Sequence, residues 1–204
     1  MTRRSATAIA LLALALIWGF PQGWGATGKE WVRLEDCRYV DDENNDGDSF
    51  HVQCGVGEFI VRLYFVDAPE TNLRYPERVR EQSEYFGITI DTSIRIGKQA
   101  GGAVKDALHQ PFIVSTRWAS AQGRTKLPRY YAFVEVGRRD LAQWLVSQGL
   151  ARTKGTTSQS PTGEPSRAAL RRFEALELEA RKQRRGAWAT SRGAGKPPPP
   201  WLHR

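Results

Sequence analysis

Polar and hydrophobic residues alternate along two neighbouring stretches of the chain, and this pattern predicts a pair of β-strands. In residues 50–54 and again in residues 59–66, an apolar side chain occupies at least every second position. A period of two is typical of a strand that buries one face. The glycines in residues 55–58 supply a turn between the two strands. Arg62 falls on the face opposite the apolar one, so we expect it to point away from the core.

Further strands and helices follow from the same reasoning. Runs rich in aliphatic and aromatic residues predict three more strands: residues 31–40, 111–118 and 130–136. Apolar residues at helical spacing predict three helices: residues 97–108, 140–152 and 165–188. Asp140 is expected to cap the second of these helices, and Gly149 to end it. The polar stretch 72–96 contains Pro76 and many charges, so we expect a long loop with one or two helical turns.

The first strand pair is preceded by Asp46-Gly47-Asp48, a sequence that is typical of a tight turn. Gly47 is expected to adopt the positive φ that such a turn requires, and Asp48 then starts the outgoing strand. Pro69 cannot donate to a sheet ladder, so the next strand is expected to stop near Asp67 and turn there. The hairpin therefore brings the carboxylates of Asp48 and Asp67 close together.

Four side chains in this region suit the chemistry of phosphodiester hydrolysis. Asp48 and Asp67 offer the hard oxygen ligands that Ca²⁺ or Mg²⁺ prefers. Glu70 is placed to take a proton from an attacking water, and Arg62 to clamp a phosphate through two parallel hydrogen bonds. Each of these residues taken singly is more often a solvated turn or a surface charge. The hypothesis of phosphodiester hydrolysis therefore depends on their order and spacing.

The sequence Asp46-Gly47-Asp48-Ser49, followed by a strand and then by Arg-Leu-Tyr-Phe-Val-Asp-Ala-Pro-Glu-Thr at residues 62–71, resembles the signature of the staphylococcal nuclease (thermonuclease) family. The resemblance covers most of residues 46–188. It implies an α+β, β-rich fold in which a five-stranded OB-type Greek-key barrel is accompanied by about three helices. It also implies Ca²⁺-dependent hydrolysis of DNA and RNA at the 5′ P–O bond, which leaves 3′-phosphates.

The resemblance implies a role for each residue of the motif. Asp48 and Asp67 would be metal ligands, together with the backbone carbonyl of Ala68. Arg62 would bind the phosphate, and Glu70 would be the general base. Ca²⁺ is the expected cofactor, in preference to Mg²⁺.

Family members place a second phosphate-binding arginine after a glycine, just before the fifth strand. Arg124, in Gly123-Arg124, fits that pattern and is the preferred candidate. Arg129 lies closer to the strand and takes the role if residues 126–128 are an insertion.

The chain departs from the archetypal nuclease in the aromatic residues that stack on a nucleobase. Gln122 stands directly before the Gly-Arg pair, and the polar loop 153–164 has no aromatic residue where the archetype has them. Trp118 or Tyr85 could replace these rings, although we expect both to be packing residues. The resemblance therefore leaves the base preference and the substrate affinity open.

The two ends of the chain predict a secretory leader and a tail. An apolar run over residues 8–20 follows two arginines and is too short for a membrane span. We expect residues 1–26 to be a signal peptide, residues 27–189 to be the nuclease domain and residues 190–204 to be a flexible, proline-rich tail. Because the leader holds two arginines, its removal lowers the formal charge from +8 to +6. A basic chain favours a polyanionic partner.

Cys37 and Cys54 are the only cysteines, and they flank the Asp46-Gly47 turn at nearly equal distances. In a hairpin they lie almost opposite each other, which allows a cross-strand disulfide outside the cytoplasm. Two buried thiols are the alternative, because a one-residue change of register would separate the cysteines.

These features predict a secreted or periplasmic, monomeric nuclease that acts on DNA, RNA or both and has no stable membrane span once the leader is cleaved. The alternative is a non-catalytic module of the same fold that binds nucleic acid or envelope material through its basic surface. A binding module has no need to keep the carboxylates and arginines together, which favours the enzyme.

Overall fold

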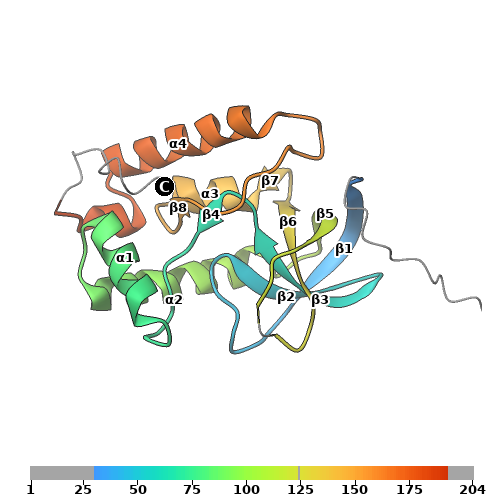
Figure 1. The fold of residues 1–204 in the computed structure, drawn as a ribbon, viewed down its shortest axis with the longest axis horizontal. Coiled ribbons are helices and arrows are strands. Elements are labelled where there is room, and N and C mark those ends of the chain that lie inside the picture. The colour runs from blue at the N-terminus through green and yellow to red at the C-terminus, as the bar shows by residue number, and fades with distance from the viewer. Residues whose placement is uncertain (1–29, 124, 193–204) are drawn as a thin grey trace, which may run out of the picture.

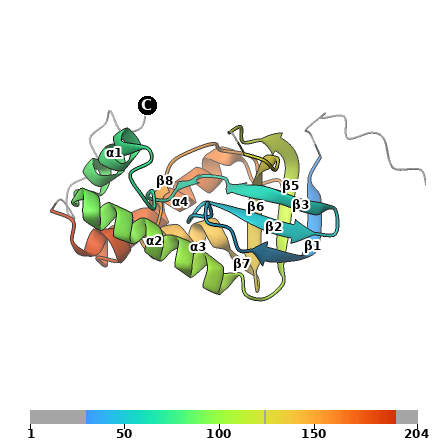
Figure 2. The same ribbon diagram turned by 90° about the horizontal axis from the view of Figure 1, so that it is seen from below.

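The computed structural model describes residues 30–123 and 125–192 of the 204-residue chain. Strands gather at one end of the molecule and helices at the other (Figures 1 and 2), so the predicted α+β fold class is confirmed. The predicted leader and most of the predicted tail lie outside the described residues. Among the helices that the structure describes, none combines the length and the apolar character needed to cross a membrane.

Five strands form a closed ring. They are β1 (Val32–Val40), β2 (Ser49–Cys54), β3 (Gly57–Leu63), β5 (Phe112–Ser120) and β6 (Arg129–Val136). The strands follow the order β3-β2-β1-β5-β6 in the sheet, and a parallel pairing of β3 with β6 joins the two edges. This closure is consistent with the OB-type fold expected from the sequence. The short strand β7 (Arg139–Asp140) continues the sheet beyond β6.

The inside of the ring is apolar because alternate residues of each strand point inwards. On β3 the inward residues are Phe59, Val61 and Leu63, which are all at most 2 % exposed. Arg62 lies between two of them in sequence and keeps part of its side chain at the surface. The alternation therefore places Arg62 on the outer face, as expected.

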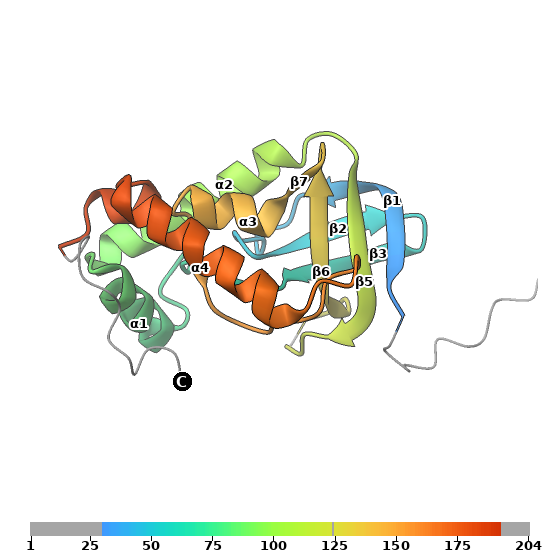
Figure 3. The same cartoon turned by 90° about the horizontal axis from the view of Figure 1, so that it is seen from above.

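Helices cover one end of the ring. The α-helices are α1 (Pro76–Phe86), α2 (Ile90–Ala107), α3 (Leu141–Ser147) and α4 (Ser166–Lys182), and η1 (Gly186–Ala189) is a short 3-10 helix. Asp140 caps α3, since its side chain accepts a hydrogen bond of 2.8 Å from the backbone N–H of Gln143. Helix α4 packs against α3 (Figure 3). The described residues thus hold four α-helices where the sequence predicted about three.

The predicted long loop at residues 72–96 is wrong, because this stretch forms α1 and the first part of α2. Pro76 is tolerated in the first turn of α1, and Gly87 ends the helix in the left-handed conformation at φ 64°. Thr89 then caps α2 by accepting a hydrogen bond from the backbone N–H of Thr92. Helix termini of this kind are local signals, and they fix both boundaries in the polar stretch.

Gly47 is required for close packing. The expected positive φ at this residue is not observed. A Cβ atom at Gly47 would instead lie 2.7 Å from the Cβ atoms of both Ala68 and Ala100. The absence of a side chain therefore lets the loop that carries Asp48 approach both α2 and the segment after β3.

Cys37 of β1 and Cys54 of β2 are joined by a disulfide, with their Cα atoms 4.3 Å apart. The neighbouring pair, Arg38 and Gln53, is in antiparallel register, which sets the two cysteines beside each other. The disulfide ties β1 to the β2–β3 hairpin that carries Arg62.

Gly97 of α2 packs directly against the backbone that carries Glu70. A Cβ atom at Gly97 would lie 2.4 Å from the carbonyl oxygens of Pro69 and Glu70, whereas one at Gly102 would meet nothing within 4 Å. We expect Gly97→Ala to lower the free energy of unfolding by about 1–3 kcal/mol through overpacking. Gly102→Ala should raise it by up to about 1 kcal/mol through helix propensity. Urea denaturation of both variants checks this, and equal stabilisation by the two would contradict the packing at Gly97.

Candidate active site

The residues of the sequence motif meet where the ring of strands faces helix α1. Ser49, the first residue of β2, pairs with Arg62 of β3, which places Asp48 beside Arg62. The chain then forms the short strand β4 (Val66–Asp67), which pairs with β8 (Arg152–Thr153). Figure 1 shows β4 and β8 between the ring and α1. We call the resulting cluster the carboxylate corner: Asp48, Arg62, Asp67 and Glu70.

Asp48 is almost fully buried and is held between a guanidinium and a backbone amide. Its Oδ1 lies 2.6 Å from Nη1 of Arg62, and its Oδ2 accepts a hydrogen bond of 2.7 Å from the backbone N–H of Ala68. Asp46 fixes the preceding turn, because its Oδ1 accepts a hydrogen bond from the backbone N–H of Asp48. Burial raises the pKa of Asp48 well above its usual value; Arg62 opposes this shift, and the neighbouring carboxylates add to it.

Asp67 is also buried and is surrounded by hydrogen-bond donors. Its Oδ1 lies 2.8 Å from Nη2 of Arg78 and 3.4 Å from Nη2 of Arg62. Its Oδ2 accepts hydrogen bonds from Nε of Arg152 at 2.8 Å and from Nε2 of Gln82 at 3.1 Å. Burial alone would raise the pKa of Asp67, but the three guanidinium groups hold it below its usual value. Asp67 is therefore ionised at neutral pH.

Glu70 is half-buried at the edge of the corner. Its Oε1 lies 2.9 Å from Nε of Arg78 in an ion pair, and its backbone N–H donates to Oε1 of Gln82 at 2.9 Å. Gln82 also donates to the carbonyl oxygen of Ala68 at 3.0 Å, so it orients the backbone on both sides of Pro69. Burial raises the pKa of Glu70 although Arg78 opposes the shift, and a raised pKa suits a general base.

Arg152 links Asp67 to helix α1. Its Nη1 and Nη2 donate to the two carboxylate oxygens of Glu81 at 2.8 and 2.5 Å, and its guanidinium lies 4.9 Å from the centre of the Tyr85 ring. Only 2 % of the Arg152 side chain is exposed. None of the supporting residues outside the motif was predicted from the sequence: Arg78, Glu81, Gln82 and Arg152. A helical assignment of residues 76–86 would have placed three of them on one helix.

The structure does not place both candidates for the second phosphate-binding arginine. Arg124 lies outside the described residues. Arg129 holds the loop before β6, because its Nε donates to the carbonyl oxygen of Gln122 at 2.8 Å and its Nη2 donates to that of Ala121 at 3.2 Å. Arg129 forms no ion pair with the carboxylate corner in the part of the chain that the structure describes.

The two aromatic residues considered as replacement base-stacking groups serve in packing. Tyr85 is 8 % exposed, and its hydroxyl donates a hydrogen bond to Glu177. Trp118 packs edge-to-face on Phe59 and Tyr130, with ring centres 5.5 and 5.0 Å apart. Both rings therefore contribute to the packing of the protein.

The oxygen atoms of the corner suit a hard cation. Asp48 and Asp67 supply carboxylates and Ala68 supplies a backbone carbonyl, which are ligand types that calcium prefers. Oδ1 of Asp48 already lies 2.6 Å from Nη1 of Arg62, so a cation bound to this oxygen would share it with the guanidinium. Within residues 30–123 and 125–192, no cluster of three or more His, Cys, Asp or Glu side chains is arranged to hold a metal. Other oxygen ligands, such as a phosphate or water, would have to complete the coordination.

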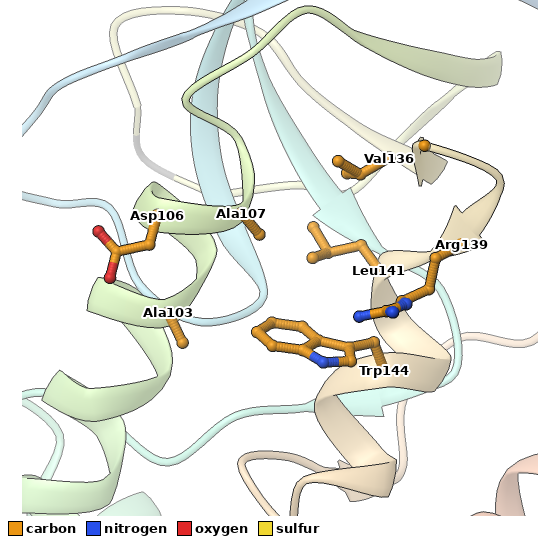
Figure 4. A pocket seen from close by; sticks show the side chains of 8 residues that line it. Ala103, Asp106, Ala107, Val136, Arg139, Leu141 and Trp144 are labelled. Carbon is orange, nitrogen blue, oxygen red and sulfur yellow. The ribbon is translucent and has the colours of Figure 1, made fainter.

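A separate pocket of about 540 Å³ lies between α2 and α3. Figure 4 shows Leu141 and Trp144 of α3 facing Ala103 and Ala107 of α2 across this pocket. No residue of the carboxylate corner lines it. The proposed chemistry therefore belongs to the corner and not to this pocket.

A closed ring of strands, with carboxylates and arginines gathered at one corner, defines the class of protein: an α+β protein with an OB-type fold. The family model described as staphylococcal nuclease homologue matches residues 60–190, which is more than half of the chain, and the chain belongs to this family. The match includes Arg62, Asp67 and Glu70 but begins after Asp48. No curated protein gives a significant match. Family membership confirms the resemblance seen in the motif and supports a nuclease-type protein.

Proposed function

We propose that this protein is a secreted or periplasmic nuclease that uses Ca²⁺ to hydrolyse the phosphodiester bonds of DNA, RNA or both. The observation that carries the proposal is the carboxylate corner, in which Arg62 bridges Asp48 and Asp67 and Glu70 stands at the edge. Phosphodiester hydrolysis needs a general base, a cationic phosphate binder and ligands for a metal ion. Membership of the staphylococcal nuclease homologue family supports a nucleic-acid substrate.

Glu70 is the proposed general base. Its partial burial raises its pKa, and a carboxylate with a raised pKa is a stronger proton acceptor. The ion pair with Nε of Arg78 restricts the orientation of the carboxylate. Glu70 takes a proton from a water molecule as the water oxygen attacks phosphorus. The 5′ P–O bond breaks, the 5′-oxygen leaves as a hydroxyl with a proton from solvent, and the phosphate stays on the 3′-oxygen.

Arg62 and Arg124 are the proposed phosphate binders, with Arg129 in place of Arg124 if residues 126–128 are an insertion. Burial opposes the charge on Arg62, but the carboxylates around it more than offset this and raise its pKa. A charged, planar guanidinium can donate two parallel hydrogen bonds to a phosphate. It also stabilises the negative charge that develops on the phosphate oxygens in the transition state.

Asp48, Asp67 and the carbonyl oxygen of Ala68 would hold Ca²⁺, in preference to Mg²⁺, because calcium accepts irregular sets of oxygen ligands. When bound, the ion supplies positive charge that neutralises the phosphate and favours attack by water. Gln82 keeps the Ala68 carbonyl in place by donating to it. Arg152 helps to keep Asp67 ionised.

The leader, the tail and the oligomeric state complete the proposal. Residues 1–26 would be a signal peptide, residues 27–189 the nuclease domain and residues 190–204 a flexible tail. The disulfide between Cys37 and Cys54 supports a location outside the cytoplasm, where such bonds persist. We expect the mature protein to act as a monomer.

Hydrolysis of single-stranded DNA, double-stranded DNA and RNA by the leaderless protein tests this function. Reactions in Ca²⁺, in Mg²⁺ and in EDTA should show cleavage with Ca²⁺, none in EDTA, and products that carry 3′-phosphates. Binding without cleavage in every condition would contradict the proposal and would identify a non-catalytic module of the same fold.

Arg62→Lys is expected to lower the rate of hydrolysis by about 10²–10³-fold. Lysine keeps the positive charge beside Asp48 and Asp67 but cannot reproduce the planar fork of the guanidinium. Arg95→Lys, at an exposed arginine of α2, is the matched control and should keep the parental rate. Steady-state kinetics on single-stranded DNA measure both, and a fully active Arg62→Lys protein would exclude Arg62 from phosphate binding.

A further inference from the structure

We propose that a row of alternating arginine and aromatic side chains on the outer face of the ring binds the bases of a single-stranded nucleic acid next to the cleaved phosphate. We call this set the aromatic row: Arg62, Tyr131, Arg117 and Trp31. The inference rests on the proposed function, because Arg62 is both the phosphate binder and the first member of the row.

Strands β3 and β6 bring Arg62 and Tyr131 together. The two strands pair in parallel, with Arg62 opposite Tyr131. Paired residues of neighbouring strands share a face of the sheet, and successive residues alternate between faces. The next pair, Leu63 and Ala132, is buried inside the ring. Arg62 and Tyr131 therefore lie side by side on the outer face.

Strands β5 and β1 extend the row away from the carboxylate corner. Thr116 of β5 is fully buried and pairs with both Ala132 of β6 and Val32 of β1. Arg117 follows Thr116, and Trp31 precedes Val32. The Trp31 ring contacts Tyr64, the residue on which Tyr131 stacks, so Trp31 lies on the same face as Tyr131. The guanidinium of Arg117 lies 5.4 Å from the centre of the Trp31 ring. Figure 3 shows β6, β5 and β1 side by side, in agreement with the strand order.

The rings of the row rest on other aromatic side chains. Tyr131 stacks on Tyr64 with ring centres 5.1 Å apart and planes inclined by 26°. Trp31 contacts Tyr64 and Phe133 edge-on, at 6.1 and 5.4 Å. Tyr64 is buried, whereas Tyr131, Arg117 and Trp31 are half-buried and keep part of their surface open to solvent. Side chains supported in this way lose little conformational freedom when a ligand binds.

Alternating cations and rings fit a single strand better than a duplex. Unpaired bases stack on aromatic side chains and on guanidinium planes, while phosphates pair with the arginine charges. The bases of a duplex are already stacked on each other and cannot reach these rings. Four neighbouring strands span about 14 Å, so the row reaches beyond the phosphate at Arg62. It supplies the stacking groups that are missing at Gln122 and in the loop 153–164.

Binding measurements on Tyr131→Leu and Arg117→Gln, each made in the Glu70→Gln protein and in EDTA, separate recognition from cleavage. Fluorescence anisotropy with labelled oligo-dT, oligo-rU and a DNA duplex of equal length gives the Kd values. Tyr131→Leu should raise the Kd of both single strands by about 5- to 100-fold and leave the Kd of the duplex unchanged. Arg117→Gln should reduce the slope of log K against log salt by about 0.7 for the single strands. Tyr39→Leu, at a half-buried tyrosine of β1 outside the row, is the matched control and should bind as the Glu70→Gln protein does.

Two results would contradict single-strand binding at the aromatic row but would not contradict the proposed nuclease function. The first is that both variants bind single strands with the parental affinity. The second is that the variants lose equal affinity for single strands and for the duplex. Failure of the Glu70→Gln protein to bind any of the three nucleic acids, together with no cleavage by the parent, would instead overturn the proposed function. If Tyr131→Leu does not fold by circular dichroism, Arg117→Gln and Trp31→Leu decide the question in the same assay.

Discussion

Glu70→Gln is expected to lower the rate of phosphodiester hydrolysis by about 10²–10⁴-fold, which is the usual contribution of a general base. Glutamine has nearly the shape of glutamate but cannot take a proton from water. The backbone N–H of Glu70, which donates to Gln82, is unchanged in the variant. The loss should therefore appear in kcat, while the thermal stability of the protein stays close to the parental value.

Glu174→Gln is the matched control for this substitution, because Glu174 is an exposed residue of α4 outside the carboxylate corner. Single-turnover rates with single-stranded DNA and saturating Ca²⁺ measure the effect in the parent and in both variants. If Glu70→Gln cleaved as fast as the parent, another group would have to remove the proton from water.

Arg152→Met is expected to lower the free energy of unfolding by about 3 kcal/mol at neutral pH, at the lower end of the range for breaking a buried ion pair. Methionine fills much of the same volume but leaves Asp67 and Glu81 without the guanidinium that bonds to both. The loss is limited because Asp67 keeps Arg78 and Glu81 keeps Lys154 as partners.

At acid pH, the difference in the free energy of unfolding between Arg152→Met and the parent should be smaller. Burial raises the pKa of Asp67 and of Glu81, but Arg152 and the other cations more than offset this and hold both values below the usual range. These carboxylates therefore contribute stability above about pH 4, and the contribution is lost as the pH falls through their lowered pKa values. Urea denaturation in EDTA at neutral and acid pH measures this, with Arg167→Met at an exposed arginine of α4 as the control. If Arg152→Met lost no stability, or lost the same stability at both pH values, Arg152 would not stabilise these carboxylates.

The strands could be predicted from the sequence because each buries one face and so shows a period of two. The run 130–136, for example, corresponds to β6, which begins one residue earlier at Arg129. Closure of the ring could not be predicted in this way, since the parallel pairing of Arg62 with Tyr131 joins residues far apart in the chain. The aromatic row depends on that pairing, so no local pattern in the sequence indicates it.

The carboxylates and Arg62 could be predicted because they lie close together in the sequence, within one motif. The residues that support them come from other parts of the chain. The apolar pattern of the sequence does not indicate helix α1, because the buried face of this helix includes the polar residues Gln82 and Ser83. Arg152 belongs to no motif, and its burial follows from the pairing of β4 with β8. Such partners are set by tertiary structure and are visible only once the elements are packed.

The calcium dependence of single-stranded DNA hydrolysis tests the role of the carboxylate corner most directly. It is measured for the parent, for Asp48→Asn and for Asp91→Asn. The parent should reach its half-maximal rate at about 0.1–1 mM Ca²⁺, the range of extracellular calcium modules. Asp91→Asn, at an exposed aspartate of α2, should follow the parent, whereas Asp48→Asn should need far more calcium or show no activity. Hydrolysis that persists in EDTA, or that responds to calcium in Asp48→Asn as it does in the parent, would contradict metal-assisted catalysis at this corner.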